Sequence, residues 1–387
     1  MTRCSLTVWA ILLTLFCTIP AMTADGQTQD MCNGNTVCVL TWQQDTGTDM
    51  TAGYAYRTGQ NLNDSITSSS FNNNGFGQKC LANLDGQVYA QPLVVTNVSF
   101  LGKPATTVVY VVTQNDTVYA IDGTNCTILN PGGTSLLYNN PNQGTTVMTA
   151  VDCTTIGGMK CSSINPRVGV LGTPVIHLSS SSNASAGTLY VVAHMQSYVI
   201  VNGQKQYTFY HFLHALDITT LNEGVGHEQA SAPIQICSDA NPCGSYTASN
   251  FSLDHIQRPG LLYVPAGQNN LTYDTLYIGF GMMDGTSPPN FPNGVLVGYN
   301  AQSLNDVTGR LPLFQTSAGG LTTSNGGGIW MSGAAPAFGP DANTGSNRIY
   351  LTTANGTWDA NSNWGNSFIE LDPATLTVPH GWLLYAR

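Results

Sequence analysis

Four passages of the chain share one order of apolar and polar positions. Each opens with a proline and a short apolar run, continues with a second apolar run that ends near a tyrosine, and closes, after a polar loop, with a third apolar run ending on Asp or Asn. Short apolar runs separated by turn-forming residues predict three consecutive strands of a meander. The opening segments are residues 91–95, 173–176, 258–262 and 335–338.

The opening prolines recur at a regular interval. Pro92, Pro174, Pro259 and Pro336 are 82, 85 and 77 residues apart. One meander cannot bury both of its faces, whereas sheets stacked face to face around an axis bury a continuous core. The repeat therefore predicts an all-β fold, a β-propeller of four-stranded antiparallel blades. Because proline lacks an N–H, each proline should begin an innermost strand.

The composition agrees with many short strands, and it excludes two classes of binding partner. Charged residues make up 8% of the chain, and no stretch shows a sustained helical period. The net charge is −10, with 11 Lys and Arg in no basic cluster. Nucleic acid and an anionic membrane surface are therefore excluded as partners, because both attract basic patches.

The N-terminus has the features of an export signal. Arg3 supplies the positive end, residues 6–20 an apolar core too short to span a bilayer, and residues 21–24 a small-residue exit. We expect a signal peptide over residues 1–24, an extension over 25–75 and a propeller domain over 76–387. The mature protein should be exported to the periplasm, the exterior or the cell surface, with no transmembrane segment.

The cysteines fit an exported protein. Of the ten, Cys4 and Cys17 lie in the signal, which leaves eight, an even number typical of an oxidising compartment. Eight cysteines allow 105 connectivities, and free buried thiols are the alternative. Spacing predicts the pairs Cys32–Cys38, Cys153–Cys161, Cys237–Cys243 and, from the remaining two, Cys80–Cys126.

A site is expected where loops surround the propeller channel. These are the loops that lead into the innermost strands and the hairpins between the second and third strands. The first set contributes Gln91, Thr173, Arg258, Trp330 and Ser332, and the second Asn115, His194, Asp284, Asn355 and Asp359. This mostly polar ring could hold a planar polar ligand or a metal. The alternative is that tight turns need Asn, Asp and Gly.

One segment has the oxygen spacing of a calcium loop. Asp359, Asn361 and Asn363 occupy the first, third and fifth positions, and Glu370 the twelfth. Trp364 stands at the sixth position, where such loops need glycine, and Glu370 lies on a predicted strand. The candidate metal ligands are Asp359, Asn361 and Asn363.

Two further patterns have a chemical and a structural interpretation. Gly326, Gly327 and Gly328 permit close backbone approach beside Trp330, which either offers a stacking surface or packs between blades. His211 and His214 would point to opposite faces of a strand, so we interpret them as strand residues and not as a metal pair.

Four segments carry a resemblance to a known family. They are RTGQN at 57–61, GQVYAQPL at 86–93, LHALDITT at 213–220 and GIWMSG at 328–333. The chain resembles, over about residues 42–377, exported bacterial proteins with a quinoprotein-dehydrogenase-like (PQQ-like) β-propeller. The resemblance implies pyrroloquinoline quinone (PQQ) and calcium on the propeller axis of enzymatic members, which oxidise alcohols or sugars. It also implies seven or eight blades, so the four visible here indicate a partial or open propeller, and we expect a fragment of a longer one.

Two marks of the enzymatic members are absent. No tryptophan completes the docking motif Ala-x-Asp-x-x-Thr-Gly-x-x-x-Trp after Asp122 or Asp217, and no two cysteines are neighbours. These absences favour a platform that binds a protein, a glycan or a small molecule. The alternative is a quinone-dependent oxidoreductase in which Asp284 or Asp359 takes a substrate proton and Arg258 steadies the reduced quinone.

Two strands are expected outside the repeated runs. Residues 380–385 should form the outer strand of the fourth blade. Residues 76–84, ahead of the first proline, should form a strand that completes a blade supplied by the far end of the chain.

Overall fold

The computed structural model describes the greater part of the chain beyond residue 77. The described residues are 78, 80–138, 148–156, 161, 164–178, 187–223, 233–244, 246–282, 293–304, 309–317, 326–332, 334–341, 343–359, 362–379 and 383–385. The expected signal peptide and N-terminal extension lie outside them. Within the described ranges, no helix is long and apolar enough to cross a membrane.

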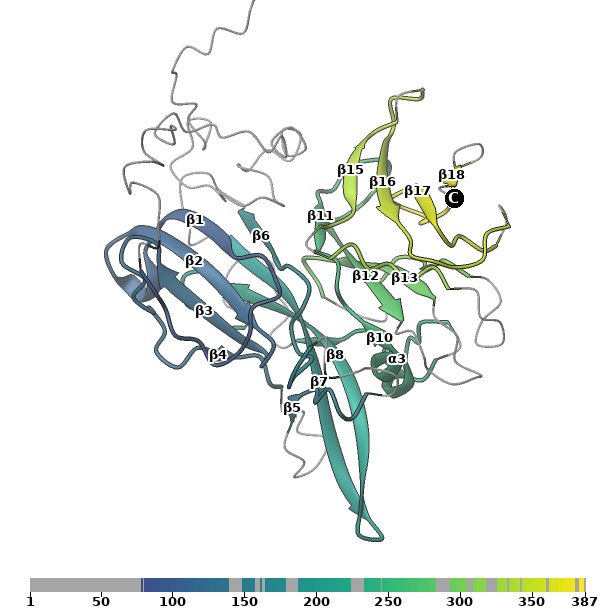
Figure 1. Ribbon diagram of the computed structural model, residues 1–387. Helices are drawn as coiled ribbons and strands as arrows, with labels where there is room; N and C mark the ends of the chain where they lie inside the picture. Colours follow the sequence, from purple (N-terminus) through teal and green to yellow (C-terminus); the bar gives the residue numbers. More distant parts are fainter. Residues whose placement is uncertain are drawn as a thin grey trace, which may run out of the picture. The chain divides into compact units, whose positions relative to one another are not determined.

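The described strands form four antiparallel sheets (Figure 1), numbered here in chain order. The first contains β1 (Leu93–Val98), β2 (Thr106–Thr113), β3 (Thr117–Asp122) and β4 (Thr134–Ser135). The second contains β5 (Thr149–Ala150), β6 (Val175–Leu178), β7 (Gly187–Val201), β8 (Gln204–Asp217) and β9 (Ile234–Gln235). The third contains β10 (His255–Ile256), β11 (Leu262–Val264), β12 (Thr275–Met282), β13 (Gly294–Asn300) and β14 (Phe314–Gln315). The fourth contains β15 (Ala337–Pro340), β16 (Asn347–Thr352), β17 (Ser367–Leu371) and β18 (Leu383–Tyr385).

The predicted meanders are confirmed as antiparallel sheets. β1, β6 and β15 begin directly after Pro92, Pro174 and Pro336, and β11 begins three residues after Pro259. Among the described strands, each of these four pairs with one neighbour only, which is the second strand of its meander: β2, β7, β12 or β16. Proline is tolerated at such a position because its missing N–H is not needed by a second neighbour.

One expectation about secondary structure is corrected. Residues 80–84 form no strand; instead Ala82 and Leu84 pack on the outer side of the first sheet. A short helix, α3 (Ala248–Asp254), also occurs, with the Thr247 side chain accepting a hydrogen bond from the Asn250 N–H at its start. This helix has only seven residues, which is too short for a helical period of apolar residues to be visible in the sequence. A 3-10 turn, η1, covers Phe100–Gly102.

Consecutive sheets bury apolar side chains against each other. Alternate residues of β7 enter different clusters: Leu189 and Val191 pack with the first sheet, whereas Tyr190 and Val192 pack with β12 and β13. A third cluster joins the third sheet to the inner face of the fourth, through residues such as Ile349. Each inner sheet is therefore covered on both faces, which explains why its strands are apolar throughout.

A tyrosine recurs in the second strand of each meander and is buried in the first three sheets. Tyr110, Tyr190, Tyr277 and Tyr350 all lie opposite the first residue of the strand that follows the proline. In three sheets the hydroxyl donates a hydrogen bond to a main-chain carbonyl just beyond the third strand of the next sheet: Tyr110 to Ile218 (2.5 Å), Tyr190 to Ala301 (3.3 Å) and Tyr277 to Pro373 (2.6 Å). We call these three contacts the tyrosine links; they join successive sheets in the same way.

Three of the four predicted disulfides are confirmed. Cys80 bonds to Cys126, Cys153 to Cys161 and Cys237 to Cys243. The Cys32–Cys38 pair lies outside the described residues. Disulfides of this number are typical of proteins that fold in an oxidising compartment.

Candidate functional site

The residues predicted to lead into the innermost strands meet in consecutive pairs. The Gln91 N–H donates to the Thr173 hydroxyl (3.0 Å), and the Thr173 carbonyl accepts from the Leu261 N–H (3.0 Å). Farther along, the Arg258 Nε donates to the Ser332 hydroxyl (2.9 Å). The structure thus brings equivalent positions of neighbouring sheets together, but their polar groups are used to bind each other.

Arg258 and Trp330 are both partly covered. The Arg258 guanidinium lies 5.5 Å from the Tyr89 ring centroid, and its Nη1 is buried without a hydrogen-bond partner among the described residues. Burial lowers the pKa of Arg258 from its usual value. The Trp330 indole lies against Gly281 and Gly328, where an added Cβ would come within 2.6 Å of it. The packed interpretation of Trp330 is therefore favoured over an open stacking surface.

The predicted hairpin residues bind neighbouring loops or, for Asp359, their own turn. The Asn115 side chain donates to the Asp85 carbonyl (2.6 Å), and the Asn355 carbonyl accepts from the Gly327 N–H (2.9 Å). The Asp359 carboxylate accepts from the N–H groups of Ser362 (2.7 Å) and Asn363 (3.0 Å). Asp284 and Asn361 lie outside the described residues.

The calcium-like spacing shows a similar use of its polar groups. Glu370, the twelfth residue of the calcium-like spacing, forms an ion pair with Arg348 (3.1 Å). No three His, Cys, Asp or Glu side chains in the described ranges gather as metal ligands. The described members of the predicted ring therefore use many of their polar groups to bind their neighbours.

His194, the predicted imidazole of the ring, belongs to a buried aromatic cluster. It lies opposite His211 in the β7–β8 pairing, and the two rings stack at 4.0 Å. Its Nε2 lies 2.7 Å from the Ser252 carbonyl of α3. The cluster continues to His255, which stacks on Phe251 at 4.4 Å. Sequence reasoning missed this cluster because its histidines come from separate strands.

Burial keeps the three histidines neutral. It lowers the pKa of His194 and of His255 to about 4. Burial also lowers the pKa of His211 well below its usual value, and repulsion from the other two histidines adds to the effect. Both ring nitrogens of His211 lack a hydrogen-bond partner among the described residues. Such unpaired buried atoms cost stability, so His211 is a strained member of the core.

Asp116 adds a buried carboxyl next to this cluster. It lies in the β2–β3 turn with φ of 57°, and its Oδ1 accepts from the His194 N–H (3.4 Å). An added Cβ at Gly169 would come within 2.5 Å of that oxygen, so glycine is required there. Burial raises the pKa of Asp116 well above its usual value, against the hydrogen bonds that it accepts.

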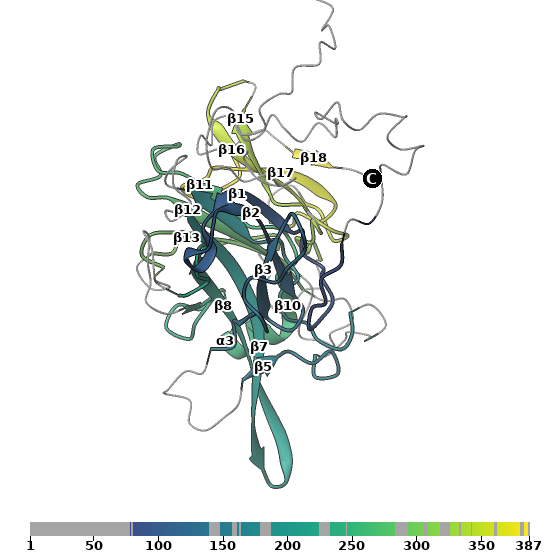
Figure 2. The same cartoon turned by 90° about the vertical axis from the view of Figure 1, so that its left-hand side faces the viewer.

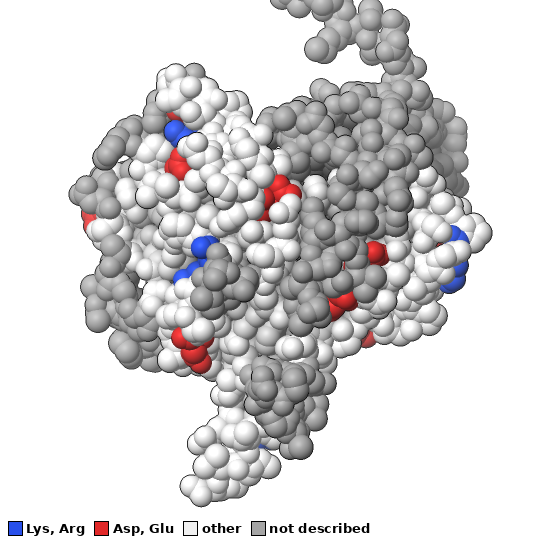
Figure 3. Space-filling model, turned by 180° about the vertical axis from the view of Figure 1, so that it is seen from behind, with Lys and Arg blue, Asp and Glu red and all other residues white. Residues whose placement is uncertain are grey.

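Among the described residues, a run of exposed apolar side chains lies on the far ends of β7 and β8, which extend away from the other strands (Figures 1 and 2). We call residues 197–208 the arm. Four consecutive apolar side chains are exposed there: Tyr198 (38%), Val199 (53%), Ile200 (68%) and Val201 (39%). Lys205 is the arm's only charged residue, and the arm is almost wholly uncharged in Figure 3. An exposed apolar strand of this kind marks an interaction surface.

The arm is longer than the sequence analysis anticipated. In the second of the four repeated passages, the second and third apolar runs cover residues 189–192 and 212–217 and predict strands there, whereas β7 and β8 add a hairpin beyond them. Asn202 and Gly203 make its turn, both with positive φ (53° and 76°). An Asn-Gly pair directly after a β-branched run such as residues 199–201 is a strong hairpin signal, so the sequence does indicate this turn.

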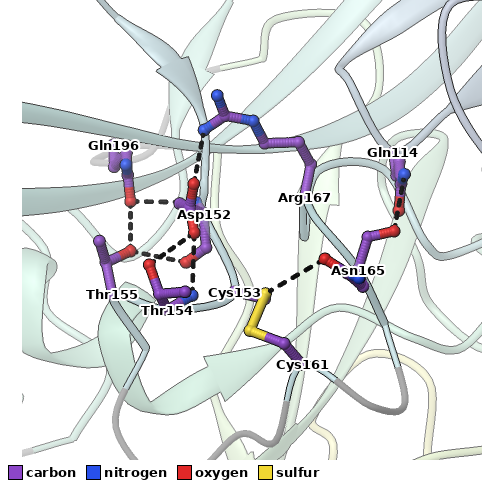
Figure 4. Close-up of a disulfide and its surroundings, with 9 residues drawn as sticks. All are labelled: Gln114, Asp152, Cys153, Thr154, Thr155, Cys161, Asn165, Arg167 and Gln196. Atoms are coloured by element: carbon purple, nitrogen blue, oxygen red, sulfur yellow. Dashed lines mark hydrogen bonds and ion pairs between the residues drawn. A yellow bond between two sulfur atoms is a disulfide. The ribbon is translucent and has the colours of Figure 1, made fainter.

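A disulfide-closed loop holds the base of the arm (Figure 4). The Gln196 Oε1 accepts from the Asp152 N–H (3.2 Å) and from the Thr155 hydroxyl (2.5 Å). Arg167 lies 3.4 Å from the Asp152 carboxylate. Cys153, the next residue, bonds to Cys161. The arm therefore leaves the protein from a fixed point.

A shallow apolar groove of about 390 Å³ lies on the fourth sheet, lined by Tyr350, Phe368 and alanines such as Ala337. In the described residues the Tyr350 hydroxyl makes no tyrosine link. Its cross-strand neighbour is Glu370, whereas Tyr110 and Tyr190 face alanines and Tyr277 faces glycine. The Glu370–Arg348 pair makes this face more polar than the three buried ones.

No protein-family model matches the chain, and no curated protein matches it. The fold alone therefore defines the class: a mostly β protein of four antiparallel sheets. The likeness to quinoprotein-dehydrogenase-like proteins remains a prediction from the four sequence segments.

The His211→Phe substitution should change how stability depends on pH. In the wild type, unfolding lets His211 bind a proton below about pH 6.5, because its folded pKa is lowered. The variant lacks that proton uptake, so its advantage over the wild type should grow by about 1.4 kcal/mol per pH unit as the pH falls below 6.5. Urea unfolding at pH 7 and pH 5 measures this difference. An advantage that does not change with pH would contradict a neutral buried His211.

The Asp116→Asn substitution should change the pH dependence of stability in the opposite direction, so that the variant gains over the wild type as the pH rises. The raised pKa of Asp116 means that the wild type loses stability as the pH rises above 3.8 toward the folded pKa. Asn keeps the acceptor for His194 and tolerates positive φ, but carries no charge. Its advantage should grow by about 1.4 kcal/mol for each pH unit in that window. The same unfolding series measures it; an advantage that shrinks with rising pH would contradict the burial of this carboxyl.

Proposed function

We propose that this protein is an exported platform that binds other proteins, with its four sheets arranged as part of a β-propeller and the arm as its contact element. The predicted signal sequence and the three disulfides support export. The observation that carries the function is the arm, which presents four exposed apolar residues on a projecting hairpin.

The tyrosine links support the propeller arrangement. Three successive sheet pairs repeat one contact between equivalent positions, from the second strand of one sheet to the end of the third strand of the next. Identical contacts repeated along a chain generate a regular rotation from sheet to sheet. A propeller is the arrangement in which four-stranded meanders stack in this way.

The arm suits binding by strand addition. Of the strands that the structure describes, none pairs with β7 beyond Gln196 or with β8 before Phe212, apart from their pairing with each other. An extended segment of a partner could hydrogen-bond to such an edge, while the alternating side chains of the arm supply apolar contact. A rigid base at Gln196 keeps the edge in place, which lowers the entropy that binding would cost.

A pair of substitutions at Ile200 tests this function. Ile200→Pro removes an edge N–H, whereas Ile200→Thr keeps it and has a comparable strand preference. Peptides selected from a phage-displayed random library on the wild-type protein should bind the proline variant about tenfold more weakly, the loss of one or two neutral hydrogen bonds.

Titration of the synthetic peptides, monitored by fluorescence anisotropy, measures these affinities. The threonine variant, as the control, should retain most of the binding. Peptides that bind all three proteins equally would contradict the role of the arm.

A further inference from the structure

The backbone of β7 directs alternate polar groups toward and away from β8. The His194 carbonyl accepts from the Val151 N–H (3.1 Å), so its backbone points toward β5 and away from β8. Antiparallel strands alternate in this respect, so Tyr198 and Ile200 also direct their N–H and C=O groups outward. Val199 points its own toward Gln206 on β8. The arm thus has an outward edge with two residues ready to pair.

This edge lacks the usual protection against self-pairing. Residues 197–201 contain no proline, glycine or charged side chain, the devices that commonly block edge-to-edge association. The Lys205 ammonium lies 4.1 Å from the centroid of the Tyr198 ring, and is thus held over the face of the hairpin. The nearest charge therefore does not guard the edge.

We infer that the arm's partner is a second copy of this chain, whose β7 edge pairs antiparallel with the first across a two-fold axis at Val199. This inference rests on the proposed function, in which the arm is the binding element. In this register Tyr198 of each copy forms a hydrogen-bonded pair with Ile200 of the other. Directly opposed residues share a face, so an aromatic ring meets an aliphatic side chain, and Val199 meets its own copy.

The net charge of the protein disfavours contact with an anionic membrane and confines the contact between two copies to the arms. Each copy carries a net charge of −10, so two copies repel each other, as would an anionic lipid surface. The five residues of β7 beyond Gln196 extend about 17 Å at roughly 3.4 Å per residue. Pairing through the arms keeps the two bodies farther apart than the Debye length of about 8 Å at physiological salt, which screens the repulsion.

Cysteine substitution at the two-fold axis tests the inference. Opposed Cα atoms in a non-hydrogen-bonded antiparallel pair are about 4.5 Å apart, a span that a disulfide bridges. Val199→Cys, treated with oxidised glutathione, should therefore give a reducible covalent dimer. Gln206→Cys is the matched control, because Gln206 lies beside Val199 on the same face of the hairpin but one strand farther from the axis. It should remain monomeric on non-reducing gels.

Each other outcome overturns the inference. Cross-linking of Gln206→Cys alone would assign the pairing to β8, equal cross-linking of both variants would indicate random contact, and no cross-linking of either would exclude the dimer. Sedimentation of the wild type with phosphatidylcholine vesicles, in place of a dimer, would assign the arm to a membrane.

Measuring peptide binding by both cysteine variants distinguishes failure of this inference from failure of the proposed function. If Val199→Cys binds the selected peptides yet stays monomeric, the proposed function stands and only the inference of a second copy is wrong.

Discussion

The structure depends on face-to-face burial of successive sheets. β7 illustrates the constraint, because its odd-numbered residues pack on one neighbouring sheet and its even-numbered residues on the other. Such a strand has no solvent face along its inner half, so every position there must be apolar or hydrogen-bonded. The tyrosine links meet that demand, since each brings a hydroxyl to a buried carbonyl and closes the gap between two sheets. Burial raises the pKa of Tyr110 and Tyr277, so both hydroxyls stay protonated and can donate.

The same constraint explains the two exceptional regions of the second sheet. Where β7 and β8 remain between neighbours, His194 and His211 are buried, neutral and stacked. Beyond Ser197, which is still buried, the four apolar side chains of residues 198–201 are exposed to solvent. The buried part costs stability through unpaired polar atoms. The exposed part carries the proposed binding role, and the loop closed by Cys153 and Cys161 lies at the boundary between them.

Much of the fold could be predicted because its signals are local. A proline before an apolar run places a strand start, and cysteines a few residues apart predict a disulfide, so both kinds of prediction held. The arm was missed because exposed Val199 and Ile200 resemble buried strand residues in a sequence; only Asn202-Gly203 indicated the hairpin. The histidine cluster could not be predicted, because the contact of His211 with Phe251 depends on how a strand packs against α3. The repeat placed Gln91 and Thr173 at equivalent positions, and the structure joins them. The repeat alone does not reveal whether the predicted ring of loop residues binds a ligand or a metal.

The equivalence of the sheets is the central claim, and hydroxyl deletion tests it most directly. Tyr110→Phe, Tyr190→Phe and Tyr277→Phe should each lower the free energy of unfolding by about 1–3 kcal/mol, because each leaves a buried carbonyl unpaired. Tyr350→Phe should change it by less than about 0.5 kcal/mol, as expected for a site without such a bond. Urea unfolding of the four variants provides the comparison. Four equal effects, or a loss confined to one of the first three, would contradict a repeated link between equivalent sheets.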